Sequence, residues 1–154
     1  MDHLKAIERL IYRYADLIDA GDFAGIGQLF ARGKIVSGGG EAAGAAAVQE
    51  IYERFTRRYE CGTPRTQHLM GNVSIDVGAD GCSATACLRF TVFQALADFP
   101  LQAVIAGRYE DRFARDDRGW HFIERRIQPQ LSGDLSRHLK LPLSQGIEGM
   151  SNAI

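Results

Sequence analysis

The stretch that decides the fold is CSATACLRFTVFQAL, residues 82–96, in which small or apolar side chains alternate with polar ones. This period of two is typical of a β-strand that buries one face. Because successive side chains of a strand point to opposite sides, five residues are expected to share the inner face. They are Ala84, Ala86, Leu88, Phe90 and Val92.

The same alternation continues on both sides of this stretch. It predicts three further strands over about residues 65–77, 101–115 and 119–129, with hairpin turns at 78–81 and 116–119. No helical pattern separates the four strands, so they are expected to pair in chain order as an antiparallel sheet.

The faces of the flanking strands depend on their regularity, because one β-bulge reverses the alternation. In a regular strand 65–77, residues 66, 68, 70 and 72 share one face, and residues 69, 73 and 75 share the other. In a regular strand 101–115, one face is apolar at one end and polar at the other. It carries Ala103, Ile105, Gly107, Tyr109, Asp111 and Phe113.

Two helices are expected at the start of the chain. Apolar residues recur every three or four positions from Leu4 to Ile18, which predicts an amphipathic helix. Gly21 is expected to end it in the left-handed conformation that glycine adopts readily. Asp22 is then expected to cap a second, short helix over residues 23–30.

A brief strand at residues 34–36, a loose stretch at 37–40 and a third helix over about 42–59 complete the first part of the chain. Three helices followed by a meander of strands predict an α+β domain that encloses a small-molecule pocket. We expect one domain over residues 1–135. The tail, 136–154, is expected to be irregular, with residues from 141 onward mobile or in contact with another chain.

Composition narrows the classes of function. The 154 residues suit one domain with one core, and 24% of them are charged. A formal net charge of -1 favours neither nucleic acid nor an anionic membrane as partner. No apolar run approaches the roughly 18 residues of a transmembrane helix, and the N-terminus lacks the apolar core of a signal peptide. We therefore expect a cytoplasmic protein.

The chain has three cysteines, Cys61, Cys82 and Cys87. Their odd number and scattered spacing do not form a disulfide framework, and no Cys-x-x-Cys pair or zinc-type histidine pair occurs. No metal is expected. The cysteines are expected to be buried, reduced thiols that act as small hydrophobic side chains.

Two residues are candidates for acid–base chemistry. His68 is the one histidine in the middle of a predicted strand, and Asp19 closes the first helix, where an acid opposes the helix dipole. Together they suggest a pair in which the carboxylate fixes the tautomer of the imidazole and stabilises its charged form. The alternatives are a half-buried strand histidine with a backbone partner and a solvated acid. Tyr14 is expected near the same rim, as a hydrogen-bond donor or as a core residue.

Four segments carry a family resemblance over about residues 4–130. They are YADLIDAGDF (14–23), RTQH (65–68), GRYEDRF (107–113) and GWHF (119–122) with Arg125. In this order they resemble the SnoaL-like branch of the nuclear transport factor 2-like superfamily, which includes polyketide cyclases, scytalone dehydratase and bile-acid dehydratase. The resemblance implies a cone in which helices wrap a bent sheet around a deep pocket.

The resemblance also implies roles for residues. It carries Asp19 and His68 onto the dyad of the dehydratases, and Tyr14 onto a tyrosine beside that dyad in bile-acid dehydratase. One departure stands out. Scytalone dehydratase has a second histidine on the next strand, and the matching stretch here, residues 88–93, has none. The superfamily also contains members without catalytic activity, so fold does not fix function.

Three other patterns do not indicate a nucleotide or nucleic-acid site. GGGEAA, residues 38–43, fits a dinucleotide-binding loop only loosely, because no second parallel strand follows, and a flexible lid is the better interpretation. Arg57-Arg58 and Arg125-Arg126 lack the aromatic partners of a nucleic-acid site. Arg125 is instead expected to point inward with residues 123 and 127, toward Asp111 in an ion pair or toward a substrate anion.

These observations favour a cofactor-free lyase or isomerase that acts on a small, apolar, cyclic substrate. In this hypothesis His68 removes a proton next to a carbonyl group, Asp19 orients it, and Tyr14 or Tyr109 hydrogen-bonds the developing oxyanion. The expected apolar wall consists of Leu88, Phe90, Val92 and Ile105.

Two alternatives stay open. The first is a non-catalytic protein that binds a small molecule, and the second is a structural subunit like the small subunit of ring-hydroxylating dioxygenases. In all three cases the open face of the sheet is expected to be covered by another copy, giving a homo-oligomer, either a dimer or a trimer.

Overall fold

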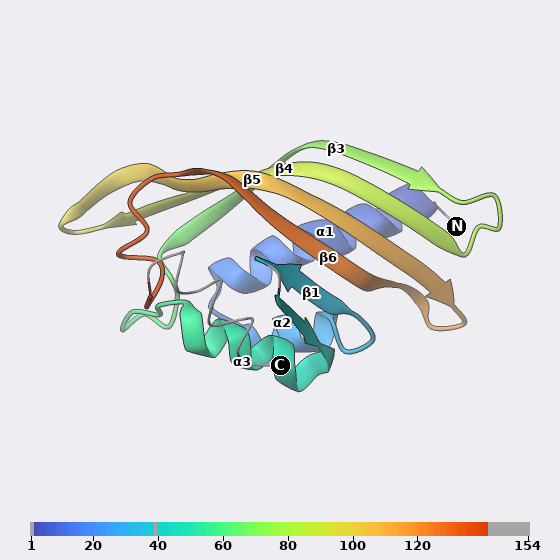
Figure 1. Ribbon diagram of the computed structural model, residues 1–154, viewed down its shortest axis with the longest axis horizontal. Coiled ribbons are helices and arrows are strands. Elements are labelled where there is room, and N and C mark those ends of the chain that lie inside the picture. The colour runs from blue at the N-terminus through green and yellow to red at the C-terminus, as the bar shows by residue number, and fades with distance from the viewer. Residues whose placement is uncertain (1, 39, 142–154) are drawn as a thin grey trace.

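Three helices and six strands make up the computed structural model, which describes residues 2–38 and 40–141 (Figure 1). In chain order they are α1 (His3–Asp19), α2 (Phe23–Leu29), β1 (Lys34–Ser37), β2 (Gly40–Ala43), α3 (Gly44–Phe55), β3 (Thr66–Val77), β4 (Ser83–Leu96), β5 (Phe99–Asp116) and β6 (Gly119–Ser132).

The six strands form one sheet in the order β2-β1-β6-β5-β4-β3. The long strands pair antiparallel in chain order, and only β1 against β6 is parallel. The sheet is bent but does not close, because β2 and β3 stay at its two edges. Figure 1 shows α1 beneath the arch of the sheet, with α2 and α3 on the far side of α1. The α+β class and the strongly bent, mostly antiparallel sheet are confirmed.

The first helix ends as the sequence predicts. The amide of Asp22 donates to the carbonyl of Leu17, and that of Gly21 donates to Ile18, which closes a Schellman motif. Gly21 has a φ of +73°, and a Cβ added to it would lie 2.1 Å from the carbonyl oxygen of Gly62. Only glycine fits this turn, and the turn fixes Asp19 at the end of the helix.

The third helix is shorter than expected, 44–55 rather than 42–59, because both of its ends are drawn into β structure. Residues 40–43 pair antiparallel with β1, so Ser37 and Gly40 of the expected loose stretch, and residues 40–43 of the expected lid, lie in paired strands instead. At the other end Thr56 has an extended backbone and forms an isolated bridge with Leu139. Tertiary pairing thus overrides the helical pattern at both ends.

Three β-bulges change the faces expected for regular strands. In β3 the register shifts between Gly71 and Ser74, with Asn72 in the left-handed conformation, so residues 73 and 75 follow His68 onto the inner face. In β5 a shift near Val104 buries that residue and exposes Ala103. In β6 a shift at residue 123 turns Arg125 inward on the same side as residues 120 and 122.

The expectation of buried cysteines is wrong, because Cys61, Cys82 and Cys87 are all free and exposed. Cys87 shows the reason: it lies on β4 between Ala86 and Leu88, both of which point into the core, so its own side chain points outward. Leu4, expected in the apolar stripe, is exposed in the first turn of α1. No helix among residues 2–38 and 40–141 is long and apolar enough to cross a membrane.

The C-terminal segment is only partly described. Residues 136–141 lie outside regular elements, as expected, but they are packed: His138 is buried, and Leu139 bridges to Thr56. The mobile or partner-bound segment was expected from residue 141 onward, and all of it after Leu141 lies outside the described residues.

Candidate functional site

Asp19 and His68 are hydrogen-bonded to each other. The distance between Oδ1 of Asp19 and Nδ1 of His68 is 2.6 Å. The backbone amide of His68 donates to Oδ2 of the same carboxylate at 2.7 Å, and the hydroxyl of Thr66 donates to Oδ1 at 2.9 Å. Three donors thus hold one carboxylate, so its position relative to the imidazole is fixed.

Local structure brings these groups together. Asp19 is the last residue of α1, and Thr66 and His68 are the first two inward-facing residues of β3. Arg65, just before β3, has a φ of +59°, a left-handed backbone conformation that residues other than glycine rarely adopt. Arg65 therefore directly precedes the strand whose first residues, Thr66 and His68, are hydrogen-bonded to Asp19.

The arrangement defines the state of the imidazole. An ionised carboxylate can only accept hydrogen bonds, so the proton of neutral His68 is on Nδ1, and Nε2 carries the lone pair. The side chain of His68 is 3% exposed and that of Asp19 is 21% exposed. A base held in one tautomer and shielded from water is suited to accepting a proton from a bound molecule.

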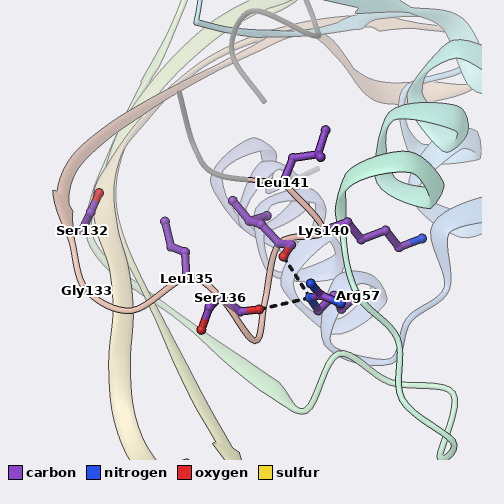
Figure 2. A pocket seen from close by; sticks show the side chains of 8 residues that line it. Arg57, Ser132, Gly133, Leu135, Ser136, Lys140 and Leu141 are labelled. Carbon is purple, nitrogen blue, oxygen red and sulfur yellow. Dashed lines mark hydrogen bonds between the residues drawn. The ribbon is translucent and has the colours of Figure 1, made fainter. Parts of the chain in front are cut away.

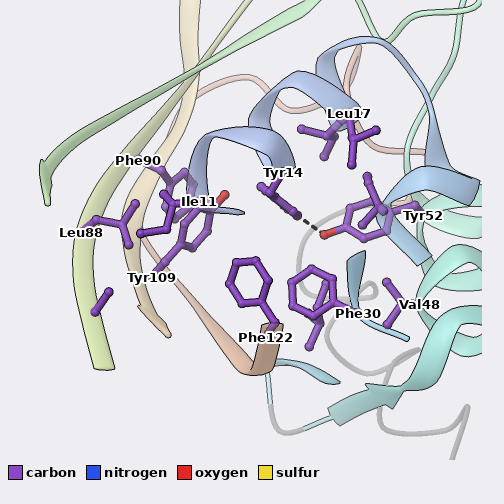
Figure 3. Packing of buried hydrophobic residues seen from close by; sticks show 14 of the residues in the cluster. Ile11, Tyr14, Leu17, Phe30, Val48, Tyr52, Leu88, Phe90, Tyr109 and Phe122 are labelled. Carbon is purple, nitrogen blue, oxygen red and sulfur yellow. Dashed lines mark hydrogen bonds between the residues drawn. The ribbon is translucent and has the colours of Figure 1, made fainter. Parts of the chain in front are cut away.

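Tyr14 lies at the centre of the interior (Figure 3). Its ring is edge-on to that of His68 at 6.3 Å between centroids, and edge-on to that of Tyr109 at 5.8 Å. Its hydroxyl is hydrogen-bonded to that of Tyr52 at 2.7 Å. Burial raises the pKa of Tyr14, and the charge of Arg125 opposes that effect. The hydroxyl therefore stays protonated and able to donate at neutral pH.

Asp111 and Arg125 form a fully buried ion pair. Nε and Nη2 of Arg125 donate to the two carboxylate oxygens at 2.8 and 2.6 Å. The guanidinium also lies over the rings of Tyr14 and Tyr109, 4.5 and 4.2 Å from their centroids. Burial raises the pKa of Asp111, and Arg125 acts against it. The pairing of Arg125 with Asp111 is thus present, and Tyr14 stands between this ion pair and His68.

Of the four apolar residues expected as a pocket wall, Leu88, Phe90 and Val92 are buried in the core, and Ile105 is partly buried against it. Leu88 and Phe90 belong to the packed core, where Phe90 stacks on Tyr109 at 4.2 Å between centroids (Figure 3). Val92 lies opposite His68 on the neighbouring strand, and Ile105 lies opposite Val92 on the next one. Val92 is therefore the one of the four that lies directly opposite His68.

Neither Asp19 nor His68 lines any of three surface pockets formed by residues within 2–38 and 40–141. The largest measures about 460 Å³ and lies under the segment that follows β6 (Figure 2). It is lined by Arg57, Ser132, Gly133, Leu135, Ser136, Leu139, Lys140 and Leu141. Within residues 2–38 and 40–141, no cluster of three or more His, Cys, Asp or Glu side chains is placed to hold a metal ion.

Sequence reasoning missed several residues around this site. Thr66 could have been predicted as a neighbour of His68, because it lies two positions before it in the strand and so shares its face. Tyr52 lies in the segment expected as the third helix and has no sequence feature that marks it. His138 lies in the segment expected as an irregular tail, yet it is buried, and the charges of His68 and Asp19 both act on its ring. No local pattern indicates that contact.

Comparisons with known proteins agree with this architecture. A family model described as the SnoaL-like domain matches residues 2–126. A comparison with curated proteins found no match. Among solved structures, an NTF2-like protein with a cystatin-like fold from Novosphingobium aromaticivorans is 23% identical, with a TM-score of 0.70 over 88% of this chain and 86% of the other.

Two further solved structures are similar. A provisionally assigned scytalone dehydratase from the same organism is 21% identical, with a TM-score of 0.67 over 85% of this chain and 86% of the other. ActVI-ORFA from Streptomyces coelicolor is 17% identical, with a TM-score of 0.67 over 85% and 97%. At these identities the similarity shows a shared fold.

Proposed function

The chain belongs to the SnoaL-like domain family, and on that premise we propose that it is a cofactor-free lyase or isomerase whose base is His68. Members of this family include dehydratases, isomerases and cyclases. The observation that carries the proposal is the 2.6 Å contact between Asp19 Oδ1 and Nδ1 of a His68 side chain that is almost fully buried. The proposed substrate is a small, apolar, cyclic molecule with a carbonyl group.

In the proposed reaction, Nε2 of His68 takes a proton from the carbon next to the carbonyl, and the electron pair of that C–H bond moves toward the carbonyl oxygen. Asp19 stabilises the imidazolium that forms. In a dehydration, the enolate then expels a hydroxyl group from the β-carbon, and His68 returns the proton to it, so that one water molecule leaves and one C=C bond forms. In an isomerisation, the proton returns to another carbon.

Other interior groups have supporting roles in this proposal. Tyr14 or Tyr109 hydrogen-bonds the developing oxyanion, which both can do because burial keeps their hydroxyls protonated. The ion pair of Asp111 and Arg125 holds both tyrosine rings in place. Val92 and Ile105 form the apolar wall beside His68, with Leu88 and Phe90 packed behind them.

The first experiment measures proton removal itself. The probe is 2-tetralone, a cyclic ketone, in D₂O, and exchange of its α-protons is followed by NMR. The second probe is 3-hydroxycyclohexanone, whose dehydration to cyclohexenone is followed by ultraviolet absorbance. We expect wild-type protein to accelerate at least one reaction, and His68→Gln to lose about 10²-fold or more of that rate.

His121→Gln is the matched control, because His121 lies on β6 opposite Ala114, away from the dyad. It should leave the rate unchanged. A wild-type protein that adds nothing to the buffer rate on either ketone would overturn the proposal. Equal rates for His68→Gln and wild type would overturn it as well.

Binding without turnover is the second candidate function. It is favoured because Asp19 and His68 line none of the three pockets described above, so a molecule bound in one of them would not meet the dyad. This candidate predicts that a cyclic ketone binds with the same affinity to wild type and to Asp19→Asn, and that neither protein converts it. Calorimetric titration beside the exchange measurement separates the two functions.

A further inference from the structure

The segment after β6 returns to the end of α3 and is held there by several hydrogen bonds. The backbone amide of Arg57 donates to the carbonyl of His138 at 2.9 Å. Nε of Arg57 donates to the carbonyls of Ser136 and Leu139 at 3.1 and 2.9 Å, as Figure 2 shows. The amide of Lys140 donates to Phe55 at 2.9 Å. His138 thus lies in a fixed piece of chain.

A second set of contacts ties this segment to the strands that carry the dyad. The side-chain amide of Gln94 donates to the carbonyls of Pro64 and Arg137 at 3.0 and 2.9 Å. Gln94 is buried and lies directly opposite Thr66, whose hydroxyl donates to Asp19. The backbone next to His138 is therefore anchored at the same end of β3 and β4 as the dyad.

The side chain of His138 is enclosed as well. The residue is 6% exposed, and its Nδ1 is buried without a hydrogen-bond partner among the described residues. Oε1 of Gln94, in the same region, is buried in the same way. Interiors seldom leave polar atoms unpaired, and such atoms call for a functional or structural explanation.

We propose that His138 is a second histidine of the site, which hydrogen-bonds an oxygen of the substrate while His68 removes the proton. The inference rests on the proposed function. It explains why a residue outside the helices and strands is buried, with its backbone held by Arg57.

The electrostatics around His138 agree with this role. Burial and, to a smaller extent, the charge of His68 lower the pKa of His138 to about 4, and Asp19 from α1 acts in the opposite direction. Since the folded-state pKa lies below the ordinary value of about 6.5, His138 is uncharged at neutral pH. An uncharged ring can donate one hydrogen bond without repelling the imidazolium that forms on His68.

The first test needs no substrate. Protein labelled with ¹⁵N at histidine is titrated by NMR, and the imidazole nitrogens of His138 are followed in wild type, His68→Gln and Asp19→Asn. We expect His138 to stay neutral well below pH 6 in wild type. His68→Gln should raise its pKa, because a repelling charge is removed, and Asp19→Asn should lower it. His121→Gln should change nothing. If the pKa of His138 lies near its ordinary value, or does not change in either variant, its placement beside the dyad is wrong.

The second test uses the exchange of 2-tetralone protons. His138→Phe keeps an aromatic ring but loses the donor, and we expect kcat to fall by about 10²-fold with little change in KM, as for other lost oxyanion donors. His138→Gln, which retains an N–H group, should recover part of the loss. If both variants exchange as fast as an active wild type, the role of His138 is wrong and the proposed function stands. If wild type is inactive, the function and this role both fail, while the titration still decides the placement.

Discussion

At the scale of single residues, Asp19 is unfavourable for its own helix but makes favourable hydrogen bonds with β3. A carboxylate at the C-terminal end of a helix opposes the helix dipole, at a cost of about 0.3–1 kcal/mol. Here the carboxylate accepts hydrogen bonds from the ring and amide of His68 and from the hydroxyl of Thr66. Charge-assisted hydrogen bonds contribute about 1.5–3 kcal/mol each, so the contacts outweigh the dipole.

Replacement of Asp19 by Asn should therefore affect both stability and activity. The amide keeps the shape but removes the charge that stabilises imidazolium and fixes the tautomer. We expect exchange of 2-tetralone protons to slow by about 10²–10⁴-fold, and unfolding in urea to show a loss of about 1–3 kcal/mol. Asp16→Asn, on the same helix but outside these contacts, is the control. Exchange at the wild-type rate in Asp19→Asn would contradict the assignment.

The ion pair of Asp111 and Arg125 predicts an effect that depends on pH. Arg125→Met leaves a buried carboxylate without its partner, which costs about 3–5 kcal/mol. Burial raises the pKa of Asp111, and in this variant Arg125 no longer lowers it, so the protonated form is favoured in the folded state. The destabilisation should be small near pH 4, where the carboxyl holds its proton, and should grow as pH rises toward 7.

Urea unfolding of Arg125→Met at both pH values measures this difference. The double variant Asp111→Leu with Arg125→Met removes both charges and should show little dependence on pH in the same range. A single variant whose loss of stability is equal at pH 4 and pH 7 would contradict the prediction.

At the scale of elements, the end of α1 decides where the carboxylate lies. Gly21 combines a left-handed backbone with a contact to Gly62 that leaves no room for a side chain. Gly21→Ala should cost at least about 1–2 kcal/mol from the backbone conformation alone, with more from the clash. Because Asp19 lies two residues away, the variant should also lose exchange activity.

Gly71→Ala is the matched control for this prediction. Gly71 has no atom within 4 Å of an added Cβ, and its φ is not positive. Thermal unfolding of both variants, followed by circular dichroism, makes the comparison. Equal midpoints for Gly21→Ala and wild type would show that the turn tolerates a side chain.

At the scale of the whole molecule, one face of the sheet carries an apolar row. Leu69, Thr91, Ala106 and Leu131 lie opposite one another across β3, β4, β5 and β6. Leu69 is 56% exposed and Leu131 is 71% exposed. A row of this kind across four strands is a surface that another copy of the chain can cover.

We therefore expect a homo-oligomer, a dimer or a trimer, with this row at its interface. Light scattering coupled to size-exclusion chromatography measures the mass of wild type and of the double variant Leu69→Glu with Leu131→Glu. Wild type should have two or three times the chain mass, and the variant should approach one. Arg89→Glu, on the same face without an apolar side chain, separates a general charge effect from loss of the row. A monomeric wild type would contradict the expectation.

Part of this molecule follows from the sequence because it depends on local periodicity. The period of two in residues 82–96 identifies β4 and its inner face, and Gly21 with Asp22 identifies the junction of α1 and α2. Asp19 and His68 could be named as candidates because an acid at a helix end and a histidine inside a strand are both unusual. The bend of the sheet and the class of fold followed from the same patterns and the family resemblance.

The rest was decided by contacts between residues far apart in the chain. A β-bulge has no fixed sequence signature, so the burial of Val104 and the placement of Arg125 on the same face as residues 120 and 122 appear only when strands pair. Residues 42 and 43, at the start of the expected third helix, pair with β1, and Thr56, near its end, pairs with Leu139. The helical pattern of that segment does not predict either contact. His138 lies 70 residues from His68 and is brought near it by tertiary contacts, among them the hydrogen bonds of Arg57 and Gln94. Local sequence sets which face a side chain takes, whereas three-dimensional packing sets which side chains meet.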